Sequence, residues 1–181
     1  MFLTNPPFAG EIRETALLRN YELAMRKGKV PKKVERDLLF IERALQLIKP
    51  GGRMAIVLPQ GKLNNTNTEY VRKWIMDKAR ILAVVGLHVN TFKPHTGTKT
   101  SVLFLQKWGG EAGKPKEDYP IFMATSKKPG KDNSGQYVYK KDEKGNFILD
   151  EKGRRILEHD LDDIAEAFVK FAKEQKFSFW E

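Results

Sequence analysis

A run of five consecutive apolar residues, Met54 to Leu58, is the feature that most constrains how this chain can fold. A half-exposed strand alternates apolar with polar residues, whereas an unbroken apolar run of this length is typical of a strand buried on both faces. Two further apolar runs follow, Ile81–Leu87 and Ser101–Leu105. We therefore expect a largely parallel sheet covered by helices, which places the chain in the α/β class.

Helical patterns separate these strands. Over Lys33–Ile48, apolar side chains recur at spacings of four, three, four and three residues, as on one face of a helix. A second helix is expected over Glu11–Arg26, with a break near Asn20 as an alternative, and a third runs to about residue 78 from the capping box Thr66-x-x-Glu69. With a first strand at Met1-Phe2-Leu3, the predicted order is strand, helix, strand, helix, strand, strand, with a hairpin-like return at the end.

Asn5-Pro6-Pro7-Phe8 follows the first predicted strand and carries the most specific chemistry in the chain. Proline fixes its own φ and favours an extended conformation in the residue before it, so this loop is stiff. Open α/β sheets bind ligands beyond the carboxyl ends of their strands. A planar amine lying on the Phe8 ring can donate one N–H to the side-chain oxygen of Asn5 and the other to the Pro6 carbonyl. Such a site suits the exocyclic amino group of a nucleobase.

The tetrapeptide Asn5-Pro6-Pro7-Phe8 resembles the catalytic signature of S-adenosylmethionine-dependent methyltransferases that act on adenine N6 in DNA. The segments Lys49–Pro59 and Phe92–Phe104 resemble later parts of that family, the second of them specifically the modification subunit of type I restriction-modification systems. The resemblance covers Met1 to about Trp108 and, more loosely, the tail. It implies a Rossmann-like sheet of seven strands, of which this chain supplies strands four to seven, with the last two antiparallel.

The resemblance also implies roles for individual residues. Asn5, Pro6 and Pro7 would form the catalytic loop, Phe8 would stack on a flipped adenine, and Phe92 would be a second wall of the base pocket. The implied substrate is double-stranded DNA, and the implied cofactor is S-adenosylmethionine. Specificity and restriction subunits would be the partners, in a cytoplasmic complex.

The cofactor loop of that family is not found in this sequence. Such enzymes hold S-adenosylmethionine with a Gly-x-Gly loop after the first strand, and no Gly-x-Gly occurs among the 14 glycines. We therefore expect a catalytic and C-terminal fragment, produced by a shortened chain or an interrupted gene, that binds the cofactor poorly and is inactive alone. A half-sheet exposes an apolar edge, which favours self-association.

Positive charge is concentrated in the first part of the chain. Residues 1–110 hold 19 Lys and Arg against 8 Asp and Glu, a balance of +11, whereas residues 111–181 hold 14 against 15, a balance of −1. A basic surface attracts phosphate backbones. The densest cluster, predicted to contact the DNA backbone, consists of Arg26, Lys27, Lys29, Lys32 and Lys33. A solvated charge run is the alternative interpretation.

The character of the sequence changes after Trp108, which predicts a catalytic part at residues 1–108 and an appendage at residues 109–181. Short apolar segments in the appendage alternate with turns at Lys144-Gly145-Asn146 and Lys152-Gly153, which predicts a small C-terminal β-meander beginning with a strand at Tyr119–Ala124. An amphipathic helix should follow from about Leu161 to Lys173. We assign no chemistry to this appendage.

Other classes of function are less well supported by the sequence. No apolar run approaches the ~18 residues that cross a membrane, the chain has no cysteine, and its three histidines have no helical metal-ligand spacing. Two alternatives to DNA methylation stay open: methylation of RNA bases or glutamine amides, and a non-catalytic remnant that binds DNA or a partner. The basic charge favours a nucleic acid.

Overall fold

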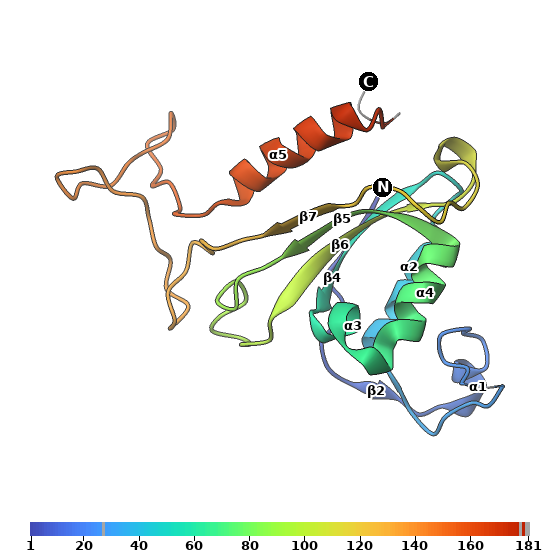
Figure 1. Cartoon of the computed structure of the whole chain (residues 1–181). Coiled ribbons are helices and arrows are strands. Elements are labelled where there is room, and N and C mark those ends of the chain that lie inside the picture. The colour runs from blue at the N-terminus through green and yellow to red at the C-terminus, as the bar shows by residue number, and fades with distance from the viewer. Residues whose placement is uncertain (27, 178, 180–181) are drawn as a thin grey trace. The chain divides into compact units, whose positions relative to one another are not determined.

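The computed structural model describes residues 1–26, 28–177 and 179, with the backbone but not the side chain of Glu111. The chain divides into two units, residues 1–84 with 101–121 and residues 85–100 with 122–181. Figure 1 colours both along the chain. The functional division predicted between residues 1–108 and 109–181 stays a prediction.

Four strands of the central sheet lie in the order β1 (Phe2–Thr4), β4 (Arg53–Pro59), β6 (Thr100–Lys107) and β5 (Ala79–Gly86). The first two are parallel, with Phe2 opposite Met54. Strand β6 is antiparallel to both of its neighbours. At the end of β6, the Lys107 amide donates to the Gly52 carbonyl at 2.9 Å, beside the start of β4. The next residue, Trp108, donates from its amide to the Lys78 carbonyl at 3.1 Å, beside the start of β5. The α/β class and the antiparallel pairing of the last two strands are therefore confirmed.

Helices α2 (Arg36–Leu47) and α4 (Glu69–Lys78) cover the same face of this sheet (Figure 1). The apolar stripe predicted for the first of them is buried in the core against β4 and β6; it includes Leu38, Ile41 and Leu45. The helix begins at Arg36 rather than Lys33, because Val34 and Glu35 form the short strand β3. The predicted apolar stripe is thus the face that packs on the sheet, and strand β3 shifts only the first residue of the helix.

The segment between β4 and α4 holds the short helix α3 (Gly61–Asn64) and the 3-10 turn η1 (Thr66–Thr68). The predicted helix is present, but its capping box is wrong, since no side-chain hydrogen bond caps either η1 or α4 among the described residues. Instead, the Thr68 hydroxyl lies within hydrogen-bond distance of the Asn65 and Gly61 carbonyls, at 2.9 and 3.1 Å. These bonds fold the segment back on itself directly after β4.

The helix predicted over Glu11–Arg26 is wrong. Glu11–Ile12 is strand β2, which pairs antiparallel with β3 (Val34–Glu35), and only Thr15–Leu18 is helical, as α1. The cause is Glu42, which is 1% exposed and accepts hydrogen bonds from the Glu22 and Leu23 amides at 2.9 and 2.8 Å. These amides are bonded to a buried carboxylate, so they are not available to continue a helix.

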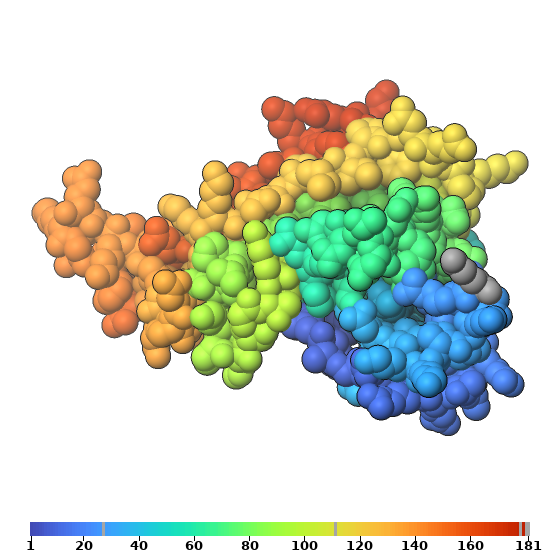
Figure 2. Space-filling view, turned by 60° about the horizontal axis from the view of Figure 1, so that its bottom comes forward, coloured from blue at the N-terminus to red at the C-terminus, as the bar shows by residue number. Residues whose placement is uncertain are grey.

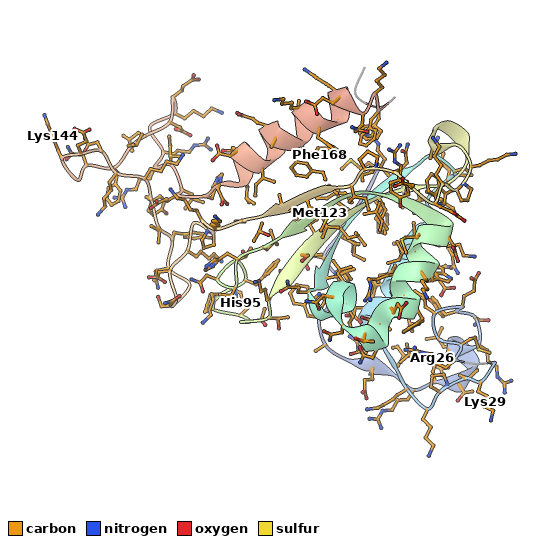
Figure 3. All side chains as sticks on the ribbon, viewed as in Figure 1. Arg26, Lys29, His95, Met123, Lys144 and Phe168 are labelled. Atoms are coloured by element: carbon orange, nitrogen blue, oxygen red, sulfur yellow. The ribbon has the colours of Figure 1, made fainter. Side chains whose placement is uncertain are left out.

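In the second unit, strand β7 (Phe122–Thr125) packs against helix α5 (Leu161–Glu174) through aromatic rings. The Phe122 ring lies 5.5 Å from Phe168, which Figure 3 labels, and 5.7 Å from Phe171. The amphipathic helix is confirmed. The strand begins three residues later than predicted, because Tyr119 belongs to the first unit, where its hydroxyl accepts from the Ile81 amide at 3.1 Å.

Three hairpins of similar sequence follow β7, within residues 129–159. Each begins at an aspartate whose side chain accepts two backbone amides, and each turns at a glycine with positive φ; the three pairs are Asp132 and Gly135, Asp142 and Gly145, and Asp150 and Gly153. The hairpins close on one another in a ring: the Lys140 amide donates to Ile156, Ile156 to Ile148, and Ile148 to Lys140, at 2.8, 3.0 and 3.0 Å. The two predicted turns are confirmed, while the meander consists of isolated bridges rather than continuous strands.

The 3-10 turn η2 (Gly110–Ala112) follows β6 and belongs to the first unit. The Gly109 amide donates to the Gly113 carbonyl at 2.7 Å. Just before it, the buried Trp108 donates from its indole nitrogen to the Met76 carbonyl at 2.8 Å. These bonds tie the end of β6 to the C-terminal turn of α4.

Candidate active site

The Asn5–Phe8 loop leaves the sheet at the carboxyl end of β1. Because β1 is parallel to β4 and Thr4 pairs with Ile56, the loop lies beside the carboxyl end of β4. Pro6 is buried, Phe8 is half-buried, and Asn5 and Pro7 are exposed. A buried proline fixes the loop to the sheet while the Asn5 amide faces outward, as a binding loop requires.

Asn5 and Phe8 line two different hollows. Asn5 lies at the rim of a shallow hollow of about 350 Å³ on the sheet, whose other lining residues are almost all apolar: Leu3, Thr4, Ala55, Val57 and Val102. Phe8 lines a second hollow of about 490 Å³ together with Ala9, Gly10, Glu11, Glu35 and Asp37. The second hollow combines one aromatic ring with three carboxylates, and its volume exceeds that of a nucleobase.

An ion cluster of two buried groups, Lys62 and Asp37, and the exposed Glu35 lies at the Phe8 hollow, which both carboxylates line. Lys62, on α3, donates a short hydrogen bond to Glu35 and lies 3.5 Å from the carboxylate of Asp37. Asp37 is 3% exposed, and its Oδ2 atom has no hydrogen-bond partner among the described residues. Burial is the main cause that raises the pKa of the Asp37 carboxyl, and the nearby Glu35 raises it further, while Lys62 opposes both.

The loop that carries Phe8 is fastened to this cluster by the backbone. The Arg36 amide donates to the Gly10 carbonyl at 2.9 Å, and Glu11 pairs with Glu35 across strands β2 and β3. Gly10 has φ +110°, and a Cβ atom there would lie 3.0 Å from the Arg36 guanidinium. The end of the Asn5–Phe8 loop therefore has a fixed position relative to the start of α2.

Tyr70 on α4 extends the polar cluster. Its hydroxyl is buried without a hydrogen-bond partner among the described residues, and burial raises its pKa. The guanidinium of Arg26 lies 3.4 Å from the centre of the Tyr70 ring, within the range of a cation–π contact. Asp37 and Glu35 also act electrostatically on Tyr70, so this residue and the ion cluster share one region of the first unit.

The predicted basic cluster forms a loop anchored beside Tyr70. Arg26 and Lys29 form a two-way backbone bridge at 2.9 Å, and Figure 3 shows both on this loop. Lys29 and Lys32 are exposed, whereas Lys33 donates to Glu11 at 2.6 Å. Lys27 lies outside the described residues. In Figure 2 the blue surface of this N-terminal segment lies beside the green surface of α4. The contact of these side chains with DNA stays a prediction.

Phe92 belongs to the second unit, in the loop between β5 and β6. It is half-buried, and its carbonyl accepts from the Thr96 amide at 3.1 Å. The first hairpin fastens this loop, since the Asn90 side chain donates to Asn133 at 3.0 Å and Lys131 donates to the Lys93 carbonyl at 2.8 Å. The role of Phe92 as a second wall of the base pocket stays a prediction.

Sequence reasoning did not identify Asp37, Lys62 or Tyr70 as site residues. Asp37 stands in the first turn of an amphipathic helix, where an acidic residue is ordinary, so its burial is invisible in the sequence. The only indication of its burial in the sequence is that Asp37 directly precedes Leu38 and Leu39, which lie on the apolar side of the helix.

Neither a metal-binding cluster nor a membrane-spanning helix occurs among the described residues. Within residues 1–26, 28–177 and 179, no three His, Cys, Asp or Glu side chains are grouped so that they could hold a metal ion. In the same part of the chain, no helix is both long and apolar enough to span a bilayer.

The hollow beside Asn5 does not by itself offer the groups that would hold S-adenosylmethionine. A methyl donor of this kind needs a carboxylate for its ribose and glycines that allow close approach of its charged end. The hollow beside Asn5 offers five largely apolar neighbours and no carboxylate or glycine among its lining residues.

Known proteins share sequence with this chain. The chain matches the family described as N-6 DNA Methylase over residues 1–180. It is 30% identical over 108 residues to the type I restriction enzyme EcoEI methylase subunit of Escherichia coli, covering 59% of this chain and 21% of that protein. It is 31% identical over 117 residues to the EcoKI methylase subunit of the same species, covering 64% and 20%. The chain thus spans about a fifth of the length of these curated relatives.

Solved structures share the fold. The type I restriction-modification system methyltransferase subunit from Streptococcus thermophilus superposes with a TM-score of 0.58 at 22% identity, covering 92% of this chain and 30% of that one. A putative class I S-adenosylmethionine-dependent methyltransferase from Listeria monocytogenes gives 0.54 at 22% identity, covering 68% and 36%. Since the family match runs over nearly its whole length, this chain belongs to the N-6 DNA Methylase family.

Proposed function

We propose that this chain is the catalytic part of a methyltransferase that modifies the N6 amino group of adenine in double-stranded DNA. The observation that carries the proposal is the Asn5–Phe8 loop at the carboxyl end of β1, with Phe8 lining a hollow of about 490 Å³. Membership of the N-6 DNA Methylase family supports the same substrate. Relatives named as type I methylase subunits support a complex with specificity and restriction subunits.

The chemistry required of the chain is to hold a poor nucleophile. The lone pair of the adenine amine is delocalised into the ring, and two acceptors that take both N–H groups favour a tetrahedral nitrogen with a free lone pair. The Asn5 side-chain oxygen and the Pro6 carbonyl are these acceptors, and they act by orientation and electrostatic stabilisation. S-adenosylmethionine supplies the methyl group when bound, with residues beyond this chain completing its site.

The base must leave the duplex to reach this loop. Enzymes that act on a base extrude it and stack it against an aromatic or apolar surface. Phe8 supplies that surface, and the stiff prolines keep it beside the amine acceptors. The exposed cations Lys29 and Lys32 would neutralise backbone phosphates nearby.

Expression in a host without its own DNA methylation tests this function. The longest reading frame that contains this chain would be expressed together with its specificity subunit, and the genome would be sequenced with modified-base detection. We expect N6-methyladenine at a defined sequence. Methylation only of RNA, methylation only of glutamine side chains, or unmodified DNA in a host that produces both soluble subunits would contradict the proposal.

A further inference from the structure

A hollow of about 360 Å³ in the second unit gathers cationic and hydroxyl side chains to which the amine-binding loop gives no role. Its polar lining consists of two lysines, one histidine and two hydroxyl residues: Lys99, Lys127, His88, Thr125 and Ser126. No carboxylate is among the residues that line it. A hollow with positive charge on its walls and no negative charge attracts an anion.

The hollow lies where three strands begin or end. Strand β5 ends at Gly86 and β7 ends at Thr125, and the Ser126 amide donates to the Gly86 carbonyl at 2.8 Å. On the other side, the Leu87 amide donates to the carbonyl of Thr100, the first residue of β6, at 2.9 Å. The carboxyl ends of β5 and β7 therefore lie together at this hollow. The carboxyl ends of strands are where open α/β sheets bind their ligands.

Hydrogen bonds within the unit fix the segments that carry these donors. The Asp160 carboxylate accepts from the Ser126 hydroxyl at 2.6 Å and from the Lys127 amide at 2.7 Å, which holds the backbone after β7 in one position. The His88 Nδ1 atom accepts from the Asn90 amide at 3.1 Å. In the neutral imidazole the proton is then on Nε2, so the ring has an N–H donor for a ligand.

Two ammonium groups at the hollow lack a partner charge. Lys99 and Lys127 are both exposed, and neither forms an ion pair among the residues that the structure describes. Lys128, the next residue along the chain, pairs instead with Glu158 at 3.5 Å. Phosphate oxygens accept several hydrogen bonds at once, and lysine binds a phosphate group as a point charge. The donors at this hollow therefore suit a phosphate group.

We propose that this hollow binds a phosphate group of a DNA strand, with Lys99, Lys127 and the Nε2–H group of His88 as its donors. The phosphate chemistry rests on the hollow itself, whereas the choice of DNA as its source rests on the proposed function. The two remaining lining residues, Leu87 and Val89, are apolar. They provide a surface for the sugar carbons that adjoin a phosphate group in a DNA strand.

The first test is an NMR titration of the isotope-labelled, unaltered chain with inorganic phosphate. Sodium chloride and sodium acetate at the same ionic strength are the references. We expect phosphate to shift the amide signals of Lys99 and Lys127 and the ring signals of His88 with saturation, and the two references to leave them in place. Equal shifts with chloride or acetate would show only a general attraction of anions, and they would overturn the site.

Three variants assign the binding to this hollow. Lys99→Gln and Lys127→Gln should each weaken phosphate binding about fivefold, the effect of one lost hydrogen bond to the anion. Lys128→Gln removes the same charge one residue away, where Glu158 already pairs with it, so it should change binding by less than about twofold. A loss in Lys128→Gln as large as in Lys127→Gln would contradict a defined site. All three positions are exposed, so each variant should keep the fold.

A duplex dodecamer then tests the source of the phosphate group. We expect it to shift the same signals and to weaken the apparent affinity of inorganic phosphate, since the two compete for one site. Phosphate binding that the duplex does not affect would overturn DNA as the source. Duplex binding that shifts the signals of Lys29 and Lys32 but not those of His88 would contradict this contact and leave the proposed function in place. Unmethylated DNA in the expression host, with competition at the hollow intact, would contradict the proposed function and not the phosphate site.

Discussion

The ammonium of Lys62 lies 3.5 Å from the buried Oδ2 atom of Asp37 while it donates its hydrogen bond to the more exposed Glu35. The two carboxylates share one cation, and only one of them is well solvated. Burial of Asp37 is therefore the main influence on the pKa of its carboxyl group, which it raises. The arrangement joins β3, α2 and α3 at the wall of the Phe8 hollow, and it makes the ionisation of one carboxyl group part of the stability of the site.

The unfolding free energy should consequently fall as pH rises through the folded-state pKa of Asp37. The folded pKa lies above the unfolded value of about 3.9, so the unfolded state releases its proton first, and the stabilisation present at lower pH is lost as the buried group ionises. Urea denaturation between about pH 4 and pH 8 measures this, as the difference between the original chain and Asp37→Asn. We expect that difference to decline with pH. A matched Asp77→Asn change, at an exposed position of α4, serves as the control. A rising difference for Asp37→Asn would show that the carboxylate is stabilised in the folded state.

DNA binding should weaken sharply between about 50 and 200 mM salt, because bound phosphates release counterions. Lys29→Gln and Lys32→Gln should each reduce the slope of log affinity against log salt by about one. Lys33→Gln should have a smaller effect, since Lys33 already pairs with Glu11 at 2.6 Å. Lys73, paired with Glu69 on α4 at 2.8 Å, provides the matched control. Affinity that does not depend on salt would remove this loop as a backbone contact.

The chain alone should bind S-adenosylmethionine poorly. The hollow beside Asn5 supplies apolar contacts and one amide, without a carboxylate or glycine among its lining residues. Isothermal titration calorimetry of the purified chain tests this expectation. Affinity in the low micromolar range would show that these residues form a cofactor site after all.

The fold could be predicted from the sequence wherever burial determined it. The unbroken apolar run Met54–Leu58 predicted β4, and the spacing of apolar residues in α2 predicted the face of that helix that is buried in the core. Two proline residues after a strand indicated the position of the stiff Asn5–Phe8 loop. Each of these patterns lies within a single strand, helix or loop, so it can be recognised without knowing the rest of the fold.

The features that the sequence did not predict depend on polar contacts between residues far apart in the chain. Glu42 removes two amides from a predicted helix 20 residues earlier in the chain, and nothing near Glu22 in the sequence indicates that. The hydrogen-bonded ring of Lys140, Ile148 and Ile156 needs three hairpins at once, so no single hairpin reveals it. In the same way, Asp37 becomes a candidate site residue only when α3 brings Lys62 to it.

Phe8→Ala should chiefly weaken capture of the flipped base. The change removes a stacking surface that is worth roughly 1–3 kcal/mol per base. Phe8→Trp and Phe8→Tyr retain an aromatic face and should keep substantial activity. Binding of duplexes with 2-aminopurine at the target position would report extrusion as a rise in fluorescence. An alanine variant with the full rise would show that Phe8 does not hold the base.

The most direct measurement of the central claim is single-turnover methylation by the full-length enzyme that carries this chain with Asn5 changed to Ala. In the proposed function, Asn5 provides an acceptor that matters most as the amine becomes tetrahedral, so we expect the rate to fall roughly a hundredfold or more, comparable to loss of one oxyanion-hole donor. Affinity for DNA and for the cofactor should change much less. An unchanged single-turnover rate would show that Asn5-Pro6-Pro7-Phe8 is only a turn in this protein and would contradict the proposed function.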